Sequence, residues 1–68
     1  MPTPNDYELE IERDQIEATK YRRRAESARK EGKRRDAERF TESAQSWEKH
    51  AEKHLRILAT MIGQEQPA

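Results

Sequence analysis

Apolar side chains recur at alternating steps of three and four residues along two long segments of this chain. In the second segment the spacing selects Ala37, Phe40, Ala44, Trp47, Ala51, His54, Leu58 and Met61. In the first segment it selects Tyr7, Ile11, Asp14, Ala18, Tyr21, Ala25 and Ala28. This spacing places the selected residues on one stripe of an α-helix, as in the seam of a coiled coil. We therefore predict two long amphipathic helices.

Glycine and proline lie only at the ends of the two segments or between them. The complete set is Pro2, Pro4, Gly32, Gly63 and Pro67. Thr3 or Asn5 can cap the first helix, and Gly32 can adopt the left-handed conformation that ends one. The boundaries predict a helix over about 5–31, a turn near Gly32, a helix over about 34–62 and a short flexible C-terminal tail.

Folding about Gly32 brings the two stripes face to face. The predicted fold is an all-α, coiled-coil-like antiparallel hairpin that forms a single domain over residues 1–68. Its core is thin because eight of its apolar residues are alanine. Chains this short usually need a disulfide, a metal or a partner, and this one has no cysteine. We therefore expect a homodimer in which two hairpins form a four-helix assembly.

Several apolar residues remain outside the predicted seam. Leu9 and Ile16 lie one heptad apart on the opposite side of the first helix, and Ile57 turns away from the seam of the second. The open end of the hairpin is therefore apolar on several faces, which favours contact with another chain. The predicted partner or dimer contacts are Tyr7, Leu9, Ile16, Ile57 and Met61.

Charge is balanced over the whole chain but unevenly distributed along it. The 14 basic and 14 acidic residues give a net charge of −4 for residues 1–21, +5 for 22–39 and −1 for 40–68. The predicted basic turn face consists of Arg22, Arg23, Arg29, Lys30, Lys33, Arg34 and Arg35. Interleaved acids favour a solvated, salt-bridged region, with pairs such as Glu26–Lys30 and Arg34–Glu38. A face for an acidic protein surface is the next interpretation, and nucleic-acid binding is the third.

Few residues suggest chemistry. His50 and His54 have metal-ligand spacing on a helix, but the sequence offers no evident third ligand, and we interpret His54 as a polar seam residue. The acids near the start fan around a helix, and no nucleophile, phosphate loop or paired carboxylate stands out. We expect no enzymatic activity, catalytic residue, cofactor or metal. Trp47, flanked by Ala44 and Ala51, is interpreted as core.

The chain start and the absence of cysteine bear on location. Met-Pro-Thr-Pro lacks the basic and apolar stretches of a leader, and no run approaches the roughly 18 apolar residues of a membrane span. The absence of cysteine fits a reducing compartment. These features predict a cytoplasmic chain without membrane association.

The small residues around the turn resemble those of known helical hairpins. The run Ala25, Ala28, Gly32, Ala37, Phe40 and Ala44 is similar to one tetratricopeptide-like hairpin and to hairpins of the microtubule-interacting-and-transport type. Phe40 lies one place off that pattern, and the first-helix Leu-Gly pair is missing. The resemblance implies close helix packing. In size and layout, the chain also resembles small dimeric hairpin regulators of phages and plasmids, which bind an RNA or a host protein.

These observations lead to one functional expectation and two alternatives. We expect a small non-enzymatic regulator or inhibitor, of the kind that phages and mobile elements encode, that occupies a site on a partner protein. The first alternative is an RNA- or DNA-binding regulator that uses the basic turn. The second is a structural assembly component with no soluble ligand.

Overall fold

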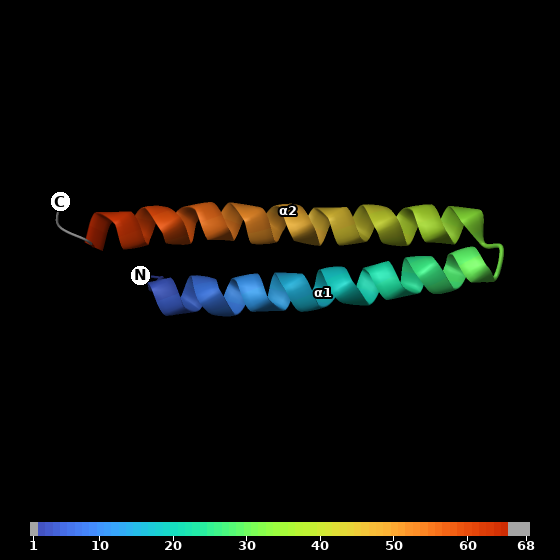
Figure 1. Cartoon of the computed structure of the whole chain (residues 1–68), viewed down its shortest axis with the longest axis horizontal. Helices are drawn as coiled ribbons and strands as arrows, with labels where there is room; N and C mark the ends of the chain where they lie inside the picture. The colour runs from blue at the N-terminus through green and yellow to red at the C-terminus, as the bar shows by residue number, and fades with distance from the viewer. Residues whose placement is uncertain (1, 66–68) are drawn as a thin grey trace.

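Two antiparallel helices make up almost all of the structure. The computed structural model describes residues 2–65, in which α1 spans Pro4–Lys30 and α2 spans Arg34–Glu65. Figure 1 shows the helices side by side, with α2 running past the start of α1 at the open end. The resulting rod measures 55 × 16 × 16 Å. The predicted all-α hairpin is therefore confirmed.

The first helix begins with a capping box built by Thr3. The hydroxyl of Thr3 accepts a hydrogen bond from the Asp6 backbone N–H at 3.3 Å, and the Asp6 carboxylate accepts one from the Thr3 backbone N–H at 2.8 Å. Pro4 occupies the first helical position, where its missing N–H costs nothing. The sequence allowed Thr3 or Asn5 as the cap, and the structure selects Thr3.

A glycine-dependent cap ends α1 and turns the chain back. The Lys33 N–H donates to the Ala28 carbonyl at 2.8 Å, and the Gly32 N–H donates to the Arg29 carbonyl at 3.1 Å. These two bonds form a Schellman motif, with Gly32 in the left-handed region at φ 75°. Within residues 2–65, Gly32 is the only residue with a positive φ, which explains why the chain reverses there.

The second helix is longer than the sequence predicted. It continues through Gly63 to Glu65, so the prediction that it stops near residue 62 is wrong. Gly63 keeps a negative φ, and only a left-handed residue would have formed the expected cap. The predicted flexible tail falls partly on 64–65, which are helical, and partly on 66–68, which lie outside the described residues.

The two glycines should therefore respond oppositely to alanine. We expect Gly32→Ala to lower the free energy of unfolding by about 1–2 kcal/mol, because a Cβ is strained in the left-handed region. Gly63→Ala should raise it by about 0.5 kcal/mol, since alanine is the better helix former and a Cβ there meets nothing within 4 Å. Urea unfolding followed by circular dichroism measures both, and equal effects at the two sites would contradict this reading of the turn.

The predicted seam is confirmed as the contact between the helices. Buried in it are the apolar residues Ile11, Ala18, Ala25, Ala28, Ala37, Ala44, Ala51 and Leu58. The larger seam residues Tyr21, Phe40 and Trp47 are half-buried at its margins, so the expectation that Trp47 belongs to the core is met only in part. Alanine therefore makes up most of the buried apolar contact between the helices. Along residues 2–65, neither helix has a stretch apolar enough to cross a lipid bilayer.

Candidate functional site

A buried polar pair crosses the hairpin between Asp14 of α1 and His54 of α2. Asp14 is only 2% exposed, and its Oδ2 lies 2.8 Å from Nδ1 of His54. An ionised carboxylate can only accept, so Nδ1 of His54 is the donor. The Asp14 side chain makes no other hydrogen bond within the described residues. The pair thus satisfies a polar group that would otherwise be costly to bury.

Glu10 and several rings surround this pair. Glu10 lies one turn before Asp14, and one ligand atom from each of Glu10, Asp14 and His54 falls within 4.8 Å of the other two. The ring centroid of His54 lies 5.9 Å from that of Tyr7 and 6.4 Å from that of His50. The pair is therefore flanked by one exposed carboxylate and two rings.

Sequence reasoning identified both members of the pair but did not join them. Asp14 was the polar break in the first stripe and His54 the polar residue in the second. Equal counting from Gly32 would place Asp14 opposite residue 50, whereas the structure places it opposite residue 54. Each stripe contains a single polar residue, and this feature of the sequence could have predicted the pair, because buried polar groups are nearly always hydrogen-bonded.

The predicted contact residues do not share one environment. Leu9 and Ile16 are each 57% exposed on α1, as expected for residues outside the seam. Tyr7 is half-buried against His54, and Ile57 and Met61 are also half-buried, so these three are partly used by the hairpin itself.

Two exposed aliphatic residues of α2 were missing from the predicted contact set. Leu55 and Ile62 are 47% and 41% exposed, and they lie one heptad apart, as Leu9 and Ile16 do on α1. Neither residue belongs to the three- and four-residue spacing of the seam, and the sequence analysis did not place either of them in the contact set. Together, Leu9, Ile16, Leu55 and Ile62 form what we call the exposed aliphatic set.

The residues of the predicted basic turn face are all exposed. They are Arg22, Arg23, Arg29, Lys30, Lys33, Arg34 and Arg35. Three are in ion pairs: Arg22 with Glu48 of the opposite helix, Lys30 with Glu26 at 4.0 Å, and Lys33 with Glu31 at 3.3 Å. The predicted Glu26–Lys30 pair is present, but Arg34 and Glu38 do not pair. The turn is therefore partly neutralised by its own acids.

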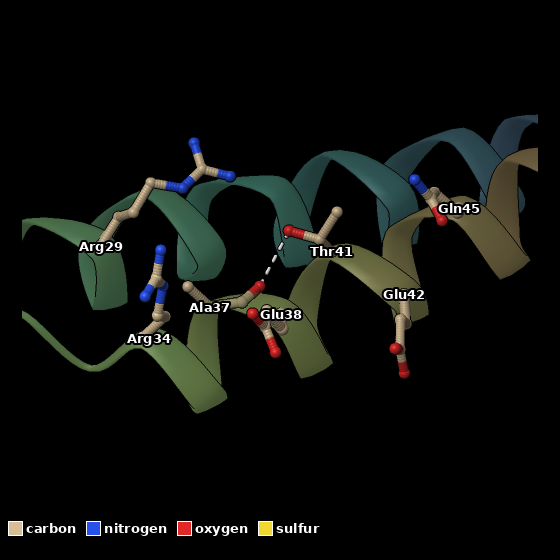
Figure 2. A pocket seen from close by; sticks show the side chains of 7 residues that line it. All are labelled: Arg29, Arg34, Ala37, Glu38, Thr41, Glu42 and Gln45. Carbon is tan, nitrogen blue, oxygen red and sulfur yellow. Dashed lines mark hydrogen bonds between the residues drawn. The ribbon is translucent and has the colours of Figure 1, made fainter.

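A shallow hollow lies between the helices close to the turn (Figure 2). Arg29 and Arg34 line one end of it, and Glu42 and Gln45 line the other. The Thr41 hydroxyl donates to the Ala37 carbonyl at 2.8 Å, so this hydroxyl is already engaged within α2. The lining carries both charge signs, which suits a polar protein surface better than a purely anionic ligand.

The chain was compared with known proteins at the levels of family, sequence and structure. No protein-family model matches it, and no curated protein or solved structure is found to be similar.

Proposed function

We propose that this chain is a non-enzymatic protein-binding regulator that assembles as a homodimer of hairpins and acts by occupying a site on another protein. One observation carries the proposal. The contact within the hairpin is built mostly from alanine, while the four larger residues of the exposed aliphatic set remain between 41% and 57% exposed. Part of the chain's larger aliphatic surface therefore lies outside the hairpin's own interface.

The energetics favour a second chain over an isolated hairpin. Fully burying a leucine or isoleucine side chain contributes about 1.5–3 kcal/mol, whereas a chain of this size rarely gains more than about 3–5 kcal/mol from its own core. In a two-fold symmetric dimer each contact between the chains occurs twice, so each buried residue contributes twice to the free energy of association. Covering the exposed aliphatic set is thus comparable in size with the whole stability expected of one hairpin.

Charge supports one arrangement of the two hairpins. Residues 22–39 around the turn carry net +5, and residues 1–21 carry net −4. A dimer with its turns at opposite ends brings each basic turn beside an acidic open end, although salt screens charges this exposed. Such a dimer keeps part of the basic turn face on its surface, where it fits an acidic patch on a partner protein.

The dimer can be tested with one charge placed in the exposed aliphatic set. Leu9→Asp and Ile16→Asp should each weaken self-association by at least about tenfold, because a carboxylate would be buried at an apolar contact. Sedimentation equilibrium over a range of chain concentrations measures this. Ser27→Asp, an exposed position on the same helix three turns beyond Ile16, is the matched control and should associate as the parent does.

Two results would count against the regulator proposal. If the parent chain stays monomeric at all concentrations, the homodimer proposal is wrong. If Leu9→Asp and Ser27→Asp associate equally strongly, Leu9 does not lie in the dimer contact. Pull-down from a lysate tests the foreign partner. Reproducible recovery of nucleic acid without any protein would favour the alternative below.

The alternative function is RNA or DNA binding through the basic turn face. The observation that favours it is the pair Arg29 and Arg34, which line one hollow and form no ion pair within residues 2–65. Phosphate-driven binding weakens steeply with salt because counterions are released. A gel-retardation assay with RNA and with DNA at low and high salt therefore tests this alternative. A complex that forms at low salt and is lost at high salt supports it, and the absence of retardation at low salt counts against it.

A further inference from the structure

The cluster of Glu10, Asp14 and His54 has the composition of a metal site. One potential ligand atom from each residue lies within 4.8 Å of the other two, and the three come from both helices. From this geometry we infer that the cluster binds one divalent transition-metal ion, with Zn²⁺ as the reference ion. This site is independent of the proposed regulatory function.

The distances are close to those that zinc requires. Zinc binds histidine nitrogen and carboxylate oxygen at about 2.0–2.2 Å, which puts neighbouring ligand atoms of a tetrahedral ion roughly 3.4 Å apart. The separation of 2.8 Å between His54 Nδ1 and Asp14 Oδ2 must open slightly, and a Glu10 oxygen, which lies within 4.8 Å of both, must settle at a similar distance from them. Glu10 is exposed and carries a flexible side chain, so it can make this movement without disturbing the seam.

Two of the three ligands are held in place before the ion arrives. Asp14 is fixed by burial in the seam, and the side chain of His54, which is 20% exposed, is oriented by its bond to Asp14. The ion takes the position of the Nδ1 hydrogen, so the imidazole that binds it carries its hydrogen on Nε2. Fixed ligands lose little freedom on binding, which favours affinity.

The ligand types select the class of ion. An imidazole with two carboxylates suits Zn²⁺ and similar transition metals, whereas Ca²⁺ and Mg²⁺ prefer oxygen ligands alone. Three protein ligands leave one coordination position for water or for a group from another molecule. Because α1 supplies two ligands and α2 supplies one, the bound ion would link the helices and stabilise the folded hairpin.

The test is a calorimetric titration of the untagged full chain with zinc chloride. We expect one Zn²⁺ per chain and a rise in melting temperature on saturation. Glu10→Gln should weaken the affinity by at least about tenfold, because it removes one charged ligand. Glu12→Gln removes the same charge from an exposed position two residues away and should change the affinity less than about twofold.

Glu10→Gln keeps the experiment decisive, because Glu10 is exposed and its replacement leaves the seam intact. Asp14→Asn is expected to abolish binding, and its helicity is checked by circular dichroism before the titration. Absence of saturable binding at zinc concentrations up to about 1 mM would overturn the inference, because ordinary metal sites are saturated well below that concentration. Equal losses in Glu10→Gln and Glu12→Gln, or one ion per two chains, would overturn it as well.

Discussion

Replacing His54 with leucine is expected to lower the free energy of unfolding by about 3 kcal/mol, although it adds an apolar residue to a helix seam. The substitution removes the hydrogen-bond partner of Asp14, which is 2% exposed and makes no other side-chain hydrogen bond within the described residues. A buried carboxylate without a partner must be protonated or reach water, and both outcomes destabilise the fold. Unfolding in urea with a chelator present measures the effect free of bound metal.

His50→Leu is the matched control for this experiment. His50 lies one turn before His54 on the same helix, but it is exposed and makes no hydrogen bond to Asp14. Its replacement should change the free energy of unfolding by less than about 0.5 kcal/mol, as for most surface substitutions. If His50→Leu and His54→Leu lose equal stability, the Asp14–His54 bond is not the cause.

The double variant Asp14→Leu with His54→Leu separates the worth of the pair from the penalty of breaking it. Removing both polar groups leaves an apolar seam, which is often neutral or stabilising compared with a buried ion pair. We expect the double variant to recover most of the loss seen in His54→Leu. Losses that simply add in the double variant would show that the two residues act independently.

Replacing Ala44 with leucine is expected to lower the free energy of unfolding by about 3 kcal/mol, which is the upper end of the usual range for overpacked cores. Ala44 is 0% exposed in the contact between α1 and α2, so three additional carbons have no space unless the helices separate. Separation would also loosen the neighbouring alanines, including Ala37 and Ala51, which lie one heptad away on either side. The loss should show as a lower urea midpoint.

Ala59→Leu makes the same chemical change at an exposed position of α2. Alanine and leucine are both strong helix formers, so differences in helix propensity contribute little to either variant. The control should stay within about 0.5 kcal/mol of the parent. A parent-like midpoint for Ala44→Leu would mean that the seam has room for larger side chains and that alanine does not set the helix spacing.

Much of this fold is determined by local features of the sequence. The alternating three- and four-residue spacing selected the residues that meet between the helices, because a stripe on a helix can be buried only against another element. Gly32 located the turn, since the left-handed conformation observed there at φ 75° is costly for other residues. Helix formation and the seam therefore followed from properties within a few residues of each position.

The tertiary structure decided the features that depend on how one helix slides and rotates against the other. It set the register that joins Asp14 to His54 and brings Glu10 beside them, which counting from the turn misplaced by one helical turn. It also set the rotation that leaves Leu55 and Ile62 exposed. Periodicity identifies the stripe on each helix, but it leaves sliding along that stripe undetermined. The register is then chosen by side-chain packing and by the need to pair the buried carboxylate of Asp14.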